Sequence, residues 1–158
     1  MDLIGSGTLH HTCFIVDDVE KAARKMKDSL SIKPWGIWTI TPEDCEVRGE
    51  KVPFSFRVAI APVGKANFEL IQPLSGKSVY ADRLSADGPG FHHTCIAYPS
   101  LEEMHSAKKE LLKQGRELVQ SASLGKLGEF CYFELPEIGA CLELLYLTAL
   151  PRPDKTIE

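Results

Sequence analysis

The residues His-His-Thr-Cys occur twice in this 158-residue chain, at residues 10–13 and 92–95. Imidazole nitrogens bind transition metals and also move protons near neutral pH, so a repeated histidine pair can supply part of a metal site or a catalytic site. Each copy continues into a short apolar run, which is typical of a strand. Because side chains alternate between strand faces, only one residue of each pair (His10 or His11, His92 or His93) is expected to face a shared cavity. Both strands are apolar on both faces, so this pattern leaves the choice open.

A carboxylate occupies the equivalent closing position of each half. Residues 56–71 align with residues 130–145, and the alignment matches Glu69 with Glu143. Each glutamate stands between apolar neighbours in an expected strand, where an unpaired carboxylate is costly to bury. Taken singly, such a glutamate is usually solvated at a sheet edge, and a single histidine is usually a core or surface residue. Two histidines and two carboxylates at duplicated positions favour instead a divalent-metal site.

The elements that must position these residues are repeated too, which indicates internal duplication. Each half reads as strand, helix and three strands, because Asp17-Asp18 and Ser100 can cap helices that follow runs rich in apolar and β-branched residues. We expect an α+β fold in which both βαβββ modules form one curved mixed sheet around the metal site. The expected strands are residues 9–16, 35–41, 54–62, 67–72, 92–98, 117–123, 129–135 and 140–148.

The segments between these elements suggest one domain, residues 1–158, made of two modules. Module one covers about residues 9–73 and module two about residues 91–148. A linker rich in turn residues, 74–90, joins them and is expected to hold one helical turn near residues 80–84. Residues 42–53 lie between two prolines and read as a loop. The tail, 149–158, is expected to be disordered.

The composition narrows the range of partners. With 44% hydrophobic residues the chain can bury a core, and its formal net charge of -4 with interspersed charges gives no basic stripe for nucleic acid or an anionic membrane. No apolar run approaches the roughly 20 residues of a membrane span, and no signal pattern opens the chain. Five cysteines without a Cys-x-x-Cys pair fit reduced thiols. We therefore expect a cytoplasmic homodimer that acts on a small molecule.

Four motifs in this chain resemble those of the vicinal oxygen chelate superfamily, which includes glyoxalases, bleomycin resistance proteins and extradiol dioxygenases. They are His-x-x-x-x-Val-x-Asp-Val at 11–19, Glu-Leu-Ile-Gln-Pro at 69–73, Gly-Phe-His-His at 90–93 and Leu-Glu-Leu-Leu at 142–145. The resemblance spans roughly residues 9–147. Carried over residue by residue, it implies His11, Glu69, His93 and Glu143 as the metal ligands.

Within the superfamily, the spacing is most similar to methylmalonyl-CoA epimerase and its glyoxalase-like relatives. This resemblance implies one divalent ion (Zn, Co, Ni or Mn) acting as a Lewis acid on a carbonyl or acyl-thioester oxygen, so that proton abstraction gives a metal-stabilised enediolate. Glu143, or Glu69 from the opposite face, would be the catalytic base of an isomerase, epimerase or lyase. The first-module glutamate base of the epimerases falls at or near Pro53 here, and Glu50 is the closest carboxylate.

Two alternatives belong to other functional classes. An extradiol-type dioxygenase would use two histidines and one glutamate on Fe(II) with open positions, and Glu69 speaks against it by filling one of them. A non-catalytic resistance protein that binds a small molecule would typically lack the ligand set. Cys13 and Cys95, two positions beyond His11 and His93, are expected to be small apolar wall residues.

Overall fold

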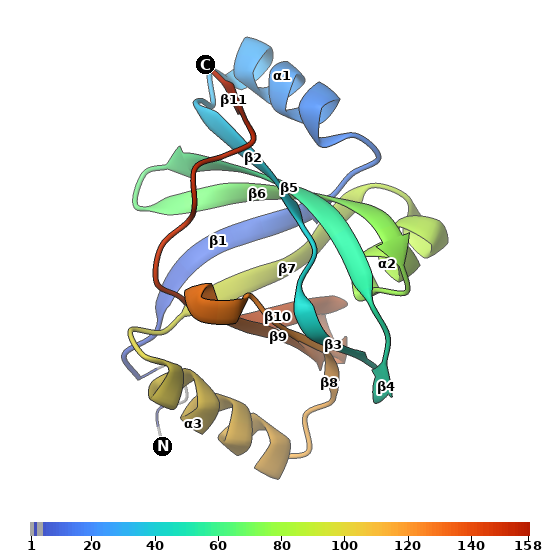
Figure 1. Cartoon of the computed structure of the whole chain (residues 1–158), viewed down its shortest axis with the longest axis vertical. Helices are drawn as coiled ribbons and strands as arrows, with labels where there is room; N and C mark the ends of the chain where they lie inside the picture. Colours follow the sequence, from blue (N-terminus) through green and yellow to red (C-terminus); the bar gives the residue numbers. More distant parts are fainter. Residues whose placement is uncertain (1, 3–4) are drawn as a thin grey trace.

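The computed structural model describes residue 2 and residues 5–158, and Figure 1 shows their arrangement. Within these residues one sheet of 11 strands runs through the molecule. Three α-helices flank it: α1 (Val19–Leu30), α2 (Val79–Asp87) and α3 (Leu101–Lys113). The strands are β1 (Thr8–Ile15), β2 (Trp35–Ile40), β3 (Glu43–Val47), β4 (Glu50–Lys51), β5 (Phe54–Val63), β6 (Ala66–Gly76), β7 (Gly90–Ala97), β8 (Leu118–Ser123), β9 (Gly128–Leu135), β10 (Ala140–Leu147) and β11 (Lys155–Ile157).

The strand order shows the duplication directly. The sheet runs β11-β2-β5-β6-β1-β7-β10-β9-β8-β3-β4, so the four strands of each half are mirrored about the central β1–β7 pair. β1 and β7 are antiparallel, whereas β1 pairs in parallel with β6, and β7 in parallel with β10. The predicted βαβββ repeat and the curved mixed sheet are confirmed.

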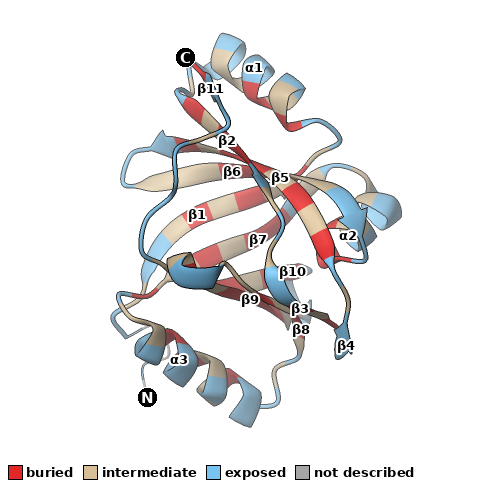
Figure 2. Cartoon of the chain, viewed as in Figure 1, coloured by how far each residue is buried: buried red, intermediate tan, exposed pale blue. Residues whose placement is uncertain are grey.

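Strand alternation divides the apolar residues between the two faces of the sheet. Leu70 packs in an outer cluster with Val19 and Ala23 of α1, whereas its neighbour Ile71 belongs to the inner cluster. The second half repeats this, with Leu144 under α3 and Leu145 inside. Figure 2 shows the buried residues running along the central strands, with α1 and α3 exposed on their solvent sides. Helices α1 and α3 therefore cover the outer face and leave the inner face to the site.

Local hydrogen bonds fix the first residues of α1 and α3. The Asp18 carboxylate accepts from the amides of Glu20 and Lys21, so Asp18 is the N-cap of α1. Ser100 is the N-cap of α3, since its hydroxyl accepts from the Glu103 amide, and the same hydroxyl donates to the Glu103 carboxylate. No helix among the described residues is both long and apolar enough to cross a membrane.

Three expectations about the connecting segments are wrong. Residues 42–53 are not a loop, since β3 pairs with β8 of the second half and β4 pairs with β3. The 74–90 segment contains α2, nine residues long, where one helical turn near 80–84 was expected; Ser78 caps this helix by accepting from the Ala81 amide. The tail, 149–158, is not disordered, because β11 pairs antiparallel with β2 and buries Ile157.

Candidate functional site

Four neighbouring central strands, β6, β1, β7 and β10, each present one metal-binding side chain to the inner face. These side chains are Glu69, His11, His93 and Glu143. The register repeats with the duplication: Glu69 lies opposite Cys13 on β1, and Glu143 lies opposite Cys95 on β7. In each half, the residue opposite the glutamate lies two positions after the histidine on the neighbouring strand. The glutamate and histidine side chains of one half therefore lie on the same face of the sheet.

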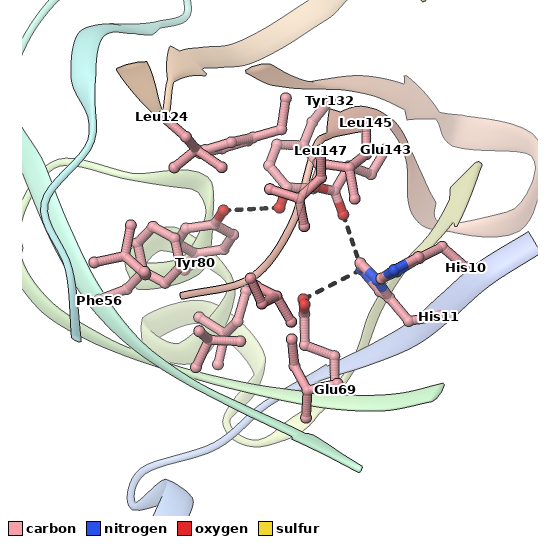
Figure 3. A pocket seen from close by; sticks show the side chains of 16 residues that line it. His10, His11, Phe56, Glu69, Tyr80, Leu124, Tyr132, Glu143, Leu145 and Leu147 are labelled. Carbon is pink, nitrogen blue, oxygen red and sulfur yellow. Dashed lines mark hydrogen bonds and ion pairs between the residues drawn. The ribbon is translucent and has the colours of Figure 1, made fainter. Parts of the chain in front are cut away.

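The four side chains converge on a small volume. The Nε2 atoms of His11 and His93 each lie 2.9 Å from Oε2 of Glu143, and 3.3 and 3.6 Å respectively from Oε1 of Glu69. The two Nε2 atoms are 3.1 Å apart. Figure 3 shows how Glu69 and Glu143 approach His11 from two sides. Ligand atoms around a tetrahedral ion with bonds of about 2.1 Å are separated by roughly 3.4 Å, so this donor set fits one divalent cation.

Burial makes the charges at this cluster strongly interdependent. All four residues are at most 7% exposed. Burial alone would lower the pKa of His11 and His93, but the carboxylates of Glu69 and Glu143 outweigh burial and raise both pKa values. Burial would likewise raise the pKa of the two glutamates, but the histidines hold it below its ordinary value. In the absence of a cation, protons on the imidazoles balance the carboxylates.

The remaining histidine of each pair contacts its neighbour instead of turning away. Nδ1 of His10 lies 2.8 Å from Nδ1 of His11, and Nδ1 of His92 lies 2.7 Å from Nδ1 of His93. An imidazole that binds a cation through Nε2 carries its proton on Nδ1 and donates it, so His10 and His92 must accept. Strand alternation alone placed these residues on the opposite face, and therefore missed this contact.

The two cysteines beside the site are buried and are not among the residues that line the pocket. Cys13 and Cys95 are fully buried, and Cys95 lies close to the rings of His10 and His11. Burial raises the pKa of both thiols, and the nearby glutamates raise it further. In the absence of a cation both thiols therefore stay protonated, which makes them poor nucleophiles.

A pocket opens beside Glu69 and Glu143, and most of its wall is apolar (Figure 3). Its polar wall residues include Tyr80 and Tyr132, whose hydroxyls lie 2.7 Å apart. Tyr80 comes from α2, within the segment expected to be a linker, so the sequence interpretation missed it. The only signal was a large aromatic residue in an otherwise small and polar stretch.

Other residues considered from the sequence lie away from this pocket. Glu50, the carboxylate closest in sequence to the expected first-module base, is exposed on β4, 3.7 Å from Lys77. The face of β5 that lines the pocket carries Phe56, Val58 and Ile60. No carboxylate of β5 therefore faces Glu143 across the pocket.

Comparisons with known proteins agree with this architecture. The family model described as Glyoxalase/Bleomycin resistance protein/Dioxygenase superfamily matches residues 10–133. The fold is similar to methylmalonyl-CoA epimerase from Mycobacterium tuberculosis (23% identity, TM-score 0.62, 89% of this chain and 88% of that chain). It is also similar to a hypothetical protein from Bacillus halodurans C-125 (19%, 0.65, 93% and 99%). A search of curated protein sequences finds no match.

A third similar structure holds a ligand. It is a Streptomyces coelicolor methylmalonyl-CoA epimerase variant in complex with 2-nitronate-propionyl-CoA, at 14% identity and a TM-score of 0.63, covering 89% of this chain and 97% of that chain. At these identities the solved structures show the common fold only.

Proposed function

Because the chain belongs to the Glyoxalase/Bleomycin resistance protein/Dioxygenase superfamily, we propose that its four-residue cluster binds one divalent metal ion and that the protein is an isomerase, epimerase or lyase. The observation that carries this proposal is the convergence of His11, Glu69, His93 and Glu143 beside an apolar pocket. When bound, the ion would supply Lewis-acid polarisation of a substrate carbonyl or acyl-thioester oxygen.

The residues of the chain supply the proton transfer. Glu143 and Glu69 both line the pocket, and their carboxylates approach from different strands, so each can reach a carbon next to a carbonyl held between them. The surrounding apolar wall excludes water, which strengthens electrostatic interactions inside the pocket. We assign Glu143 as the first base, because it lines the pocket and its Oε2 lies 2.9 Å from Nε2 of both His11 and His93, whose imidazoles could share the proton it takes.

The donor count favours this chemistry over the dioxygenase alternative. A facial triad of two histidines and one carboxylate leaves open positions for oxygen and substrate. Here a second carboxylate, Glu69, lies as close to the two histidines as a further ligand would. The reading as a non-catalytic binding protein is disfavoured by the same complete donor set.

The decisive experiment follows the substrate proton. Metal-loaded protein in heavy water should introduce deuterium at the α-carbon of an acyl thioester or an α-hydroxy ketone, read by NMR, without taking up oxygen. A positioned general base contributes roughly 10²–10⁴-fold in rate, so Glu143→Gln should lower exchange by about 100-fold or more while metal content falls much less. The matched control is Glu129→Gln, since Glu129 pairs with His105 of α3 away from the pocket.

The opposite pattern would refute the assignment. Oxygen-dependent cleavage of a catechol by the Fe(II)-loaded protein, without α-proton exchange on any carbonyl substrate tested, would establish the dioxygenase alternative. Equal losses of exchange in Glu143→Gln and Glu129→Gln would remove Glu143 from the chemistry.

A further inference from the structure

The wall of the pocket is built from apolar side chains on facing strands. Alternate residues of β5 and of β10 point into it, and they are joined by side chains from β9 and from the turn after β8. The residues that carry this argument are Phe56, Val58, Ile60, Leu124, Leu145 and Leu147. A substrate group that enters the pocket therefore exchanges water for hydrocarbon on most sides, which favours apolar groups.

The described residues that line this pocket include no lysine and no arginine. Three basic side chains, Lys65, Lys77 and Arg83, lie outside the pocket. Lys77 lies 3.7 Å from Glu50, and Arg83 lies 3.4 Å from Asp87 in a separate cavity behind His92. Lys65 is exposed at the turn between β5 and β6. None of these side chains supplies a positive charge to the pocket.

The polar groups of the pocket are neutral or negative. Tyr80 and Tyr132 are phenols whose hydroxyls bond to each other at 2.7 Å, and they bring no positive charge to the pocket. His10 directs its Nδ1 to Nδ1 of His11, 2.8 Å away. Glu69 and Glu143 would together balance the two charges of a divalent cation, and the wall of the pocket offers no other positive charge to an anionic substituent.

These observations argue against an anionic substituent on the substrate. A carboxylate buried against hydrocarbon without a partner loses its hydration and gains no ion pair. A methyl or longer alkyl group in the same place would gain from burial.

We propose that the substrate carries an uncharged, apolar substituent on the carbon next to its carbonyl, and that this pocket rejects a carboxylate there. The proposal rests on the proposed function for the identity of that carbon. It separates this protein from an enzyme acting on a methylmalonyl group, whose α-carbon bears a carboxylate.

A pair of isosteric ligands tests the proposal by binding. The N-acetylcysteamine thioesters of isobutyric acid and of methylmalonic acid differ by one methyl group in place of one carboxylate. Calorimetric titration of the metal-loaded protein should give a dissociation constant at least tenfold lower for the isobutyryl compound. A lower dissociation constant for the methylmalonyl compound, or no measurable binding of either, would overturn the proposal.

A positive charge introduced into the pocket wall by mutation provides a second test of the proposal. Leu147→Arg, on the partly exposed end of β10, should change the ratio of the two dissociation constants by at least tenfold in favour of the methylmalonyl compound. Leu74→Arg, which replaces an exposed leucine outside the pocket, should leave this ratio unchanged. If Leu147→Arg loses its metal or melts early, Leu150→Arg serves at the 42% exposed rim. The same ratio of dissociation constants in the wild type and all three variants would contradict the proposal.

The two proposals fail in distinguishable ways. A preference for the isobutyryl compound without deuterium exchange would leave the pocket inference standing and refute the proposed function. Faster deuterium exchange on the methylmalonyl compound, together with its tighter binding, would support the proposed function and refute the pocket inference.

Discussion

At the scale of single residues, the two histidines of each pair have different contacts, which their sequence does not show. His11 and His93 direct Nε2 to the cluster, and the residue before each holds the other ring nitrogen through a contact of 2.8 or 2.7 Å. This contact sets both the tautomer and the ring orientation of the two cluster histidines. In the proposed metal site, one histidine of each pair would bind the cation and the other would hold its ring in place.

Removal of that support should weaken metal binding without removing a ligand. We expect His10→Ala and His92→Ala each to lower metal affinity by about 10–100-fold, the usual effect of losing a partner that orients a ligand. Competition with a chromophoric chelator measures this, and a changed visible spectrum of the Co(II)-loaded variants would report altered ligand orientation. The control is His105→Ala, since His105 pairs with Glu129 on the exposed side of α3. An unchanged affinity in both variants would contradict the supporting role.

Part of the cluster was predictable for a physical reason. Glu69 and Glu143 each stood out because a carboxylate between apolar strand neighbours needs a partner. Strand alternation could not choose between His10 and His11, because residues on both faces of β1 are apolar and both faces are covered. Tyr80 was missed because its burial depends on α2 folding back over the inner face, which local sequence does not encode.

At the scale of elements, long periodic segments were predicted well and short paired segments were not. The central strands and both capped helices carry enough apolar residues to identify them locally. β3, with the sequence Glu-Asp-Cys-Glu-Val, buries only Cys45 and Val47, and it exists because β8 offers a free edge. β11 is three residues long and depends in the same way on the edge of β2. Both β3 and β11 form through pairing with a strand that is distant in the sequence.

Glu20 joins three of these elements and should give them a measurable pH dependence. Its carboxylate accepts from Arg57 of β5 at 2.8 Å and from Lys155 of β11 at 2.6 Å. These two hydrogen bonds lower the pKa of Glu20 from 4.5 to about 2. A lowered folded-state pKa means that the stabilisation is present above pH 4.5 and is lost as the pH falls toward 2.

We therefore expect Glu20→Gln to destabilise the protein at neutral pH by about 1 kcal/mol or less, since ion pairs at the surface contribute little. Wild type and variant should converge in stability near pH 2. Urea unfolding at both pH values measures the difference. Glu102→Gln, at an exposed position in the first turn of α3, is the control. A difference that persists at low pH would show that Glu20 acts by packing rather than charge.

At the scale of the whole molecule, the buried cluster links stability to pH and to metal. The pKa of His11 and His93 is raised above 6.5, so their contribution to the metal-free protein is present below pH 6.5 and is lost as the pH rises through the raised values. The contribution of Glu69 and Glu143, whose pKa is lowered from 4.5, is present above that pH and is lost on further acidification. The metal-free protein should therefore be most stable between these limits.

The metal should change this profile, because a cation competes with protons for the same imidazoles. We expect chelation to lower the melting temperature, and the gap between loaded and chelated protein to widen between about pH 6 and about pH 8.5. Differential scanning calorimetry of both forms measures it. A gap that is constant or narrows with rising pH would show that the four groups do not share a cation.

The two halves also exchange edge segments. β3 of the first half extends the sheet of the second beyond β8, and β11 from the end of the chain extends the sheet of the first beyond β2. Near the other terminus, the Ser6 hydroxyl donates to Glu103 of α3, so each end of the chain lies against the opposite half (Figure 1). Proteolytic cleavage near Gly88 would consequently leave two interlocked fragments, each completing a sheet edge of the other. Their reassembly would be bimolecular, and despite their common origin neither fragment could substitute for the other.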